Sequence, residues 1–193
     1  QRLDKLEQPV FDTYSRKLKR SLIKFAVALS PNKSVFGPLL FAGQLEEGLR
    51  RAAKHGFEAV ELSLRDPAQI SASELKKILS KYKLGLSAIA TGQSCLHDDL
   101  CVGSPKEENV RGVVERLKEH IDLASRFDAA IIIGGIRGRF TDSKSEMRKQ
   151  RDWALQAIQA CAEKALEKDV QLLIEPINRY ETNFINSAEE AVS

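Results

Sequence analysis

The chain has 193 residues, 42% of them hydrophobic, a length that suits one sizeable domain rather than two. Thirty basic and 27 acidic residues give a net charge of +3, too balanced to indicate a nucleic-acid partner or an acidic membrane surface. No segment approaches the run of about 18 apolar residues that a transmembrane helix needs. Because the three cysteines are scattered and odd in number, we expect no disulfide framework and a reducing, cytoplasmic location.

Residues 1–23 are predicted to form an arm outside the main domain, which we expect to span residues 24–193. The apolar residues of the arm are dispersed among charges, and Pro9 would interrupt a helix there. The segment also lacks the continuous apolar stretch of a secretory signal. We therefore expect the arm to pack loosely or against a partner.

From residue 25 onward, short apolar runs alternate with segments of helical periodicity. The predicted strands lie at 25–29, 59–64, 84–90, 129–133 and 172–174, and the predicted helices at 44–55, 73–82, 106–127 and 144–168. Gly56 stands where the first helix would need a left-handed cap. His55 and His120 lie near predicted helix ends, where we expect them only to favour the helix dipole.

Two connections are candidates for functional loops. Residues 32–43 include Phe36, Leu39 and Phe41, which either line a pocket or form a hydrophobic lid over one end of the fold. Residues 91–108 form a polar connection of about eighteen residues, which is long for a compact α/β unit.

The second connection carries Cys95, His97 and Cys101. Five residues separate the two cysteines, a spacing that does not match a structural zinc site. His97 is therefore a candidate for loop hydrogen bonding or for a substrate contact rather than for zinc.

A glycine-rich segment, GGIRGRF, follows the predicted strand at 129–133. Its glycines match neither the dinucleotide-binding nor the P-loop spacing, which excludes both of those sites. Two interpretations stay open. Arg137 or Arg139 grips a substrate hydroxyl or phosphate, or both arginines are solvated at a tight turn.

The alternation of strands and helices predicts a parallel α/β fold. Two architectures fit, a doubly wound open sheet and a (β/α)8 TIM barrel of which the chain holds about the first five βα units. A complete barrel needs about 250 residues, so the second architecture requires missing C-terminal units. The segment 187–193 favours it, because it begins like a helix with a serine cap and stops after about two turns.

Two carboxylates occupy unusual places on the predicted strands. Glu175 follows the apolar run 172–174 and precedes Pro176, which places it at the carboxyl end of a strand, where ligands of α/β proteins bind. Glu61 interrupts the strand at 59–64, where burial of a carboxylate is costly unless it is paired. The alternatives are a salt bridge from Glu175 to Arg179 and one from Glu61 to Arg65 or Lys24.

The stretches EPINRYE at 175–181 and FINSAEEA at 184–191 closely resemble the fifth-strand region of the sugar phosphate isomerase/epimerase family. That family shares the xylose isomerase-like TIM barrel and includes the ketose 3-epimerases. The segments 25–31, 56–64 and 111–139 resemble other units of the same family, so that the resemblance covers residues 24–193.

The resemblance implies a metal-dependent isomerase or epimerase that moves a proton next to a sugar carbonyl through an enediolate. It implies that Glu175 is both a metal ligand and an acid/base group, and that Glu181 contacts a substrate hydroxyl. The implied cation is Mn²⁺ or Mg²⁺, with Co²⁺ and Zn²⁺ as alternatives. Glu61, His97 and Arg137 are further candidates for substrate binding.

The remaining metal ligands of such enzymes would follow Ser193, so this chain is expected to be inactive alone and to bind metal weakly. Two other functions remain open, a metal-dependent endonuclease of the same superfold that acts on abasic DNA and a non-catalytic half-barrel that binds a partner. The endonuclease is disfavoured by the small net charge and by the lack of histidines on the third strand. The expected partner is a small sugar, with no nucleic acid or membrane, and exposed sheet edges favour a homo-oligomer.

Overall fold

The computed structural model describes residues 24–34 and 39–192. The predicted arm, residues 1–23, and Phe36 lie outside the described residues.

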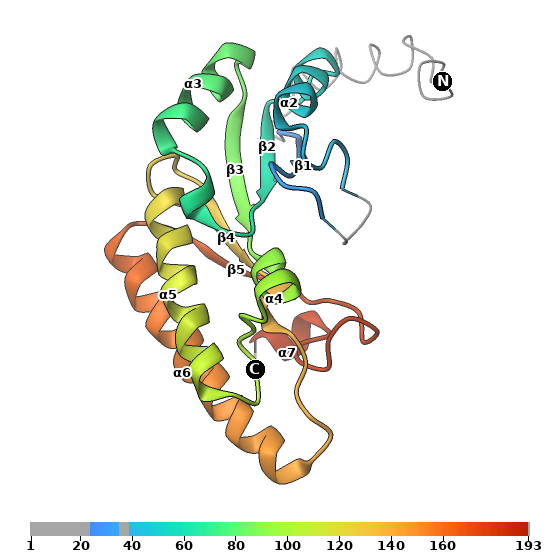
Figure 1. The fold of residues 1–193 in the computed structure, drawn as a ribbon, viewed down its shortest axis with the longest axis vertical. Helices are drawn as coiled ribbons and strands as arrows, with labels where there is room; N and C mark the ends of the chain where they lie inside the picture. Colours follow the sequence, from blue (N-terminus) through green and yellow to red (C-terminus); the bar gives the residue numbers. More distant parts are fainter. Residues whose placement is uncertain (1–23, 35–38, 193) are drawn as a thin grey trace.

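One parallel sheet organises the described chain (Figure 1). Its strands pair in the order in which they occur in the sequence, β1 (Ala26–Leu29), β2 (Ala59–Ser63), β3 (Gly85–Ala90), β4 (Ala130–Ile133) and β5 (Leu172–Ile174). A doubly wound sheet would reverse its strand order at a switch point, whereas a barrel adds each strand beside the last. The sequential order therefore decides for five strands of a TIM barrel, as one of the two predicted architectures requires.

Helices connect the strands, and the four long ones end close to the predicted positions. They are α2 (Leu45–Lys54), α3 (Ala72–Tyr82), α4 (Gly92–Asp98), α5 (Glu107–Ala124), α6 (Lys144–Glu167) and α7 (Ala188–Val192), with short 3₁₀ turns η1 (Pro67–Gln69) and η2 (Gly135–Arg137). Gly56 has a φ of 80°, as its predicted capping position requires. The Ser187 hydroxyl accepts a hydrogen bond from the Glu190 amide at 3.2 Å, which confirms the predicted start of α7. No described helix is long and apolar enough to cross a bilayer.

One expectation about the connections was wrong. Residues 91–108 were predicted to form a polar loop, but α4 occupies their first part. The segment is too short and too polar to show a clear helical period, so its helix depends on packing against η2, with which it is in contact (Figure 1).

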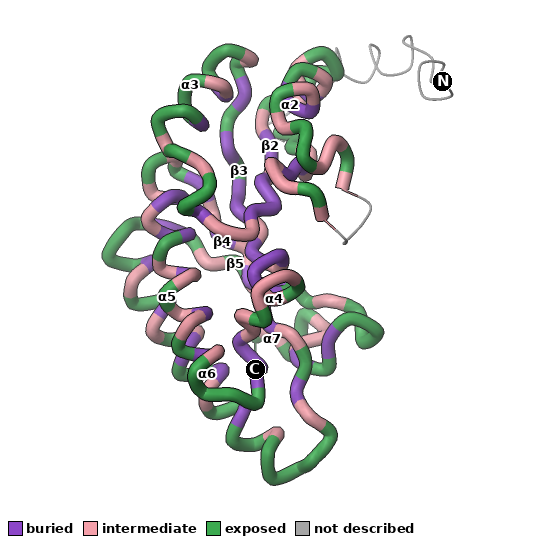
Figure 2. The backbone as a smooth tube through the Cα atoms, viewed as in Figure 1, coloured by how far each residue is buried: buried purple, intermediate pink, exposed green. Residues whose placement is uncertain are grey.

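The core lies between the sheet and the outer helices (Figure 2). On β2, Val60 and Leu62 are buried on the helix side, and the alternation of side chains directs Glu61 to the opposite, inner side. Leu117 and Ile121 of α5 are fully buried in the same core. Leu173 of β5 is 45% exposed, because β4 is the only described strand that flanks β5.

His120 belongs to this core, contrary to the expectation that it only favours a helix dipole. Its ring is fully buried, with Nδ1 2.8 Å from the Arg116 carbonyl oxygen and Nε2 3.0 Å from that of Leu64. The ring thus ties α5 to the segment after β2. Its burial lowers the pKa of His120 to about 4, although the two carbonyls act in the opposite direction.

Candidate functional site

A cavity of about 950 Å³ opens at the carboxyl ends of the strands. All five strands or the residues just after them contribute to its wall, as in a barrel active site. Among the predicted site residues, Glu61, Glu175 and Glu181 line this cavity. Leu39 lines it too, whereas Phe41 packs against the hydrophobic core.

Glu175 follows β5 directly, and its amide continues the sheet by donating to the Ile133 carbonyl at 3.2 Å. Its carboxylate lies over Gly134, where a Cβ added at residue 134 would overlap with Glu175 Oε2. The carboxylate is exposed and forms no ion pair with Arg179 among the described residues. The absence of a side chain at Gly134 therefore leaves room for a carboxylate that faces the cavity.

Glu61 lies on the inner side of β2, with β3 and β4 between it and the strand that precedes Glu175. It is half-buried, and burial, together with the negative charge of Glu175, raises its pKa. Arg65, one of the alternative partners, instead forms a salt bridge with Asp98. A bulge leaves Ser87 of β3 without a partner residue at this point, and its hydroxyl donates to the Val60 carbonyl at 3.0 Å.

Glu181 lies on a loop after β5, and hydrogen bonds from Asn178 and Arg139 hold this loop in place. The Asn178 side-chain amide donates to the Glu181 carboxylate. Arg139 donates to the carbonyls of Arg179 and Tyr180 at 3.3 and 3.2 Å. Of the two candidate arginines, Arg139 is the one that lines the cavity. Its hydrogen bonds to the backbone before Glu181 hold the loop that carries this residue.

Arg137 does not line the cavity. It is fully buried, and its guanidinium has no hydrogen-bond partner among the described residues. Burial lowers its pKa, while the charge of Glu175 opposes that effect. His97 is also absent from the wall, and its buried Nε2 lacks a partner in the described part of the chain. The structure thus brings neither of these two predicted contacts to the cavity.

Gln93 of α4 is a cavity residue that the sequence reasoning missed. Its Nε2 donates toward Ser30 Oγ at 2.9 Å, the Ser63 carbonyl at 3.0 Å and Ser63 Oγ at 2.9 Å, which fixes the amide between β1 and β2. Its Oε1 is buried and has no partner among the described residues. Its place in the sequence TGQS gave no motif signal, because its role depends on strands distant in the chain.

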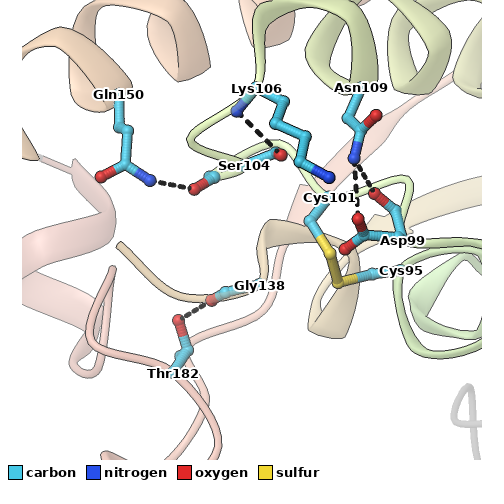
Figure 3. Close-up of a disulfide and its surroundings, with 10 residues drawn as sticks. Cys95, Asp99, Cys101, Ser104, Lys106, Asn109, Gly138, Gln150 and Thr182 are labelled. Atoms are coloured by element: carbon cyan, nitrogen blue, oxygen red, sulfur yellow. Dashed lines mark hydrogen bonds between the residues drawn. A yellow bond between two sulfur atoms is a disulfide. The ribbon is translucent and has the colours of Figure 1, made fainter. Parts of the chain in front are cut away.

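Cys95 and Cys101 form a disulfide in the cavity wall (Figure 3). This corrects the expectation that the cysteines do not pair. After α4, Asp99 adopts a left-handed conformation with a φ of 56°, which turns the chain back and leaves the two Cα atoms 4.5 Å apart. The third cysteine, Cys161, is buried in α6.

The two inner carboxylates, Glu61 and Glu175, are oxygen donors of the kind that Mn²⁺ and Mg²⁺ prefer. The described residues contain no group of three or more His, Cys, Asp or Glu side chains that could hold a metal ion. The described donors therefore fit one part of a coordination shell and not a complete one.

The chain belongs to the xylose isomerase-like TIM barrel family, whose sequence profile matches residues 49–193. It is similar to the L-ribulose 3-epimerase of Methylomonas sp. (strain DH-1), with 28% identity over 155 residues, 79% of this chain and 52% of the relative. It is also similar to the ketose 3-epimerase of Arthrobacter globiformis, with 27% identity over 164 residues, 80% of this chain and 54% of the relative. The chain thus spans about half the length of the curated relatives it matches.

Solved structures show the same fold. The crystal structure of D-allulose 3-epimerase from Methylomonas sp. in complex with D-allulose aligns with a TM-score of 0.68 at 22% identity, covering 88% of this chain and 57% of that one. The 3-keto-D-glucoside 4-epimerase from E. coli aligns with a TM-score of 0.63 at 16% identity, covering 88% and 62%. A family 2 AP endonuclease from Brucella melitensis aligns less well, with a TM-score of 0.50 at 17% identity, covering 81% and 56%.

Proposed function

We propose that this chain supplies five strands and part of the active site of a metal-dependent sugar epimerase or isomerase that acts on a ketose. The observation that carries the proposal is the position of Glu175 at the end of β5, over Gly134, in one cavity with Glu61 and Glu181. The similarity to ribulose and ketose 3-epimerases supports the same substrate class.

Glu175 is the proposed acid/base group. A carboxylate at this place can remove a proton from the carbon beside the carbonyl, and a second carboxylate from the other face of the sugar is needed to return it. Glu175 is also the proposed ligand of Mn²⁺ or Mg²⁺, with Co²⁺ or Zn²⁺ as alternatives. A bound divalent cation would polarise the carbonyl and stabilise the negative charge of the enediolate.

Three other side chains are proposed to hold the sugar. Glu181 accepts a hydrogen bond from a substrate hydroxyl, for which Asn178 and Arg139 keep its loop in place. Gln93 Oε1 is a fixed acceptor with no described partner and suits a second hydroxyl. Glu61, whose pKa is raised, can donate as well as accept when it is protonated. We assign no direct substrate contact to Arg137 or His97, because neither lines the cavity.

Substitution of Glu175 by Gln in the complete gene product tests this mechanism. We expect deuterium uptake from solvent into D-allulose, assayed with Mn²⁺ present, to fall by at least about 100-fold, because an amide cannot act as the base. Glu167→Gln, an exposed change at the end of α6, is the matched control and is expected to retain exchange. Retention of exchange by Glu175→Gln would remove Glu175 from the mechanism.

Two other functions remain as weaker proposals. An abasic-site endonuclease has support from the fold alone, through the Brucella structure. A non-catalytic half-barrel would leave the cavity without a chemical role. The cytoplasmic location and the homo-oligomer stay predictions.

A further inference from the structure

The disulfide between Cys95 and Cys101 lies where three segments of the candidate site meet (Figure 3). Cys95 belongs to α4 and Cys101 follows it, and both line the cavity. A Cβ added at Gly138 would stand 2.8 Å from Cys101 Cβ and 3.3 Å from Cys95 Sγ. The disulfide is therefore packed directly against the backbone that follows β4.

Hydrogen bonds connect this junction to segments that adjoin Glu175 and Glu181. The amides of Val102 and Gly103 donate to the carbonyls of Ile136 and Arg137 at 2.9 and 2.8 Å, which ties the disulfide segment to η2. The same turn begins next to Gly134, over which Glu175 lies.

On the other side, the Thr182 hydroxyl donates to the Gly138 carbonyl at 2.6 Å. Thr182 is buried and adjoins Glu181. The backbone at Gly138 thus joins the disulfide to the loop that presents Glu181.

The disulfide closes only a short loop, with a sequence separation of six residues. Because the stabilisation by a disulfide grows with the length of the loop that it closes, this one stabilises the fold less than a disulfide that closes a long loop. The surrounding segment has other attachments as well. Asn109 donates to Asp99 Oδ2 at 2.8 Å, and Gln150 donates to the Gly103 carbonyl at 2.7 Å. We therefore expect the fold to survive reduction and the effect of reduction to be local.

We propose that Cys95 and Cys101 are a reversible thiol–disulfide site in the wall of the candidate active site. In the reducing direction, the thiolate of a small-molecule thiol attacks one sulfur and the Cys95–Cys101 bond breaks. A second molecule of the thiol then resolves the mixed disulfide. Two small thiols lose two electrons and become one small-molecule disulfide, while the protein gains two thiols. The oxidised state holds the Gly138 junction, and the reduced state releases it.

The exchange chemistry is tested by counting thiols on the native chain, and this count does not depend on the sugar or the metal. After treatment with N-ethylmaleimide, the intact mass is expected to show no added label on the oxidised chain and two labels after dithiothreitol, at Cys95 and Cys101. Cys161 is the internal control, because it is buried and burial raises its pKa to about 11, so it is expected to react only in denaturant. Oxidised glutathione must then restore the unlabelled form.

The proposal would be overturned if the untreated chain gained labels or if the reduced chain gained none. It would also be overturned by a third label without denaturant, or by failure of oxidised glutathione to restore the unlabelled form.

Hydrogen exchange tests the consequence for the site. We expect amides of residues 101–104, 134–140 and 178–186 to exchange about tenfold faster or more in the reduced chain, with α2 and α3 unchanged. The double variant Cys95→Ser/Cys101→Ser should exchange like the reduced chain with or without dithiothreitol. Cys161→Ala should respond to dithiothreitol as the natural sequence does. Unchanged exchange in the three segments, or a uniform increase over the whole chain, would refute the coupling.

Discussion

His120 shows how the burial of a single ionisable side chain makes stability depend on pH. It is neutral in the folded chain at pH 6, because its folded pKa is about 4, while in the unfolded chain it titrates near 6.5. Between these values the unfolded state binds the additional proton, so the free energy of unfolding rises with pH. The contribution of His120 is complete above pH 6.5 and is lost as the pH falls toward 4.

We therefore expect urea denaturation to show a free energy of unfolding that is lower at pH 5 than at pH 7.5, with about 2 kcal/mol of the difference due to His120. In His120→Gln this part of the pH dependence should disappear. His55→Gln, a change at an exposed position after α2, should keep the full dependence. An equal pH dependence in His120→Gln and the natural sequence would contradict the assignment.

At the scale of the element, two glycines inside helices differ in what surrounds them. Gly112 of α5 has only Leu100 Cδ2 near the place of an added Cβ, at 3.0 Å, and Leu100 is half-buried and can shift. Gly48 of α2 faces both methyl groups of Leu29 of β1, at 2.9 and 3.1 Å from the place of an added Cβ, and Leu29 is fully buried. The same substitution should therefore have opposite effects in the two helices.

Gly112→Ala is expected to raise the free energy of unfolding by about 0.5 kcal/mol, because alanine favours a helix over glycine by about 1 kcal/mol and Leu100 must adjust slightly. Gly48→Ala is expected to lower it by about 1 to 3 kcal/mol, because the added methyl group overpacks the contact with β1. Urea denaturation of both variants measures the difference. A destabilised Gly112→Ala or an unaffected Gly48→Ala would show that these contacts are not as described.

At the scale of the whole molecule, the metal site depends on how many barrel strands contribute to it. Glu175 and Glu61 supply two carboxylates, and the described residues offer no third ligand that would complete a cluster. We expect the 193-residue chain to bind Mn²⁺ only weakly, with calorimetry giving a dissociation constant of about 1 mM or more. Glu175→Gln should weaken the binding further, and Glu167→Gln should leave it unchanged. Micromolar binding of one Mn²⁺ per chain would refute this expectation.

The sheet itself leaves two edges that pair with no other described strand, those of β1 and β5. Unpaired edges bind other strands readily, which is the reason for the predicted homo-oligomer. Light scattering of the purified chain would measure its state directly.

Local patterns in the sequence predicted the strands, most of the helices and the place of Glu175 at the end of a strand. Hydrophobic periodicity and the pair Glu175-Pro176 are local features of the sequence. They predict a position in the fold because parallel strands have their carboxyl ends together at one edge of the sheet. The alternation of side chains along a strand pointed Glu61 to the inside of a barrel, whereas Glu181 was expected at the site from the family resemblance alone.

Which of the other candidate residues reach that edge depends on how the chain packs after folding. Arg137 and Arg139 are two residues apart, yet the 3₁₀ turn buries the first and leaves the second at the cavity. The disulfide depends on the turn at Asp99, and the burial of His120 depends on the approach of α5 to Leu64. Gln93 is a site candidate only because β1 and β2 end on either side of its amide. The places of His120 and Gln93 arise from contacts between residues distant in the chain, and such contacts leave no periodic trace in the sequence.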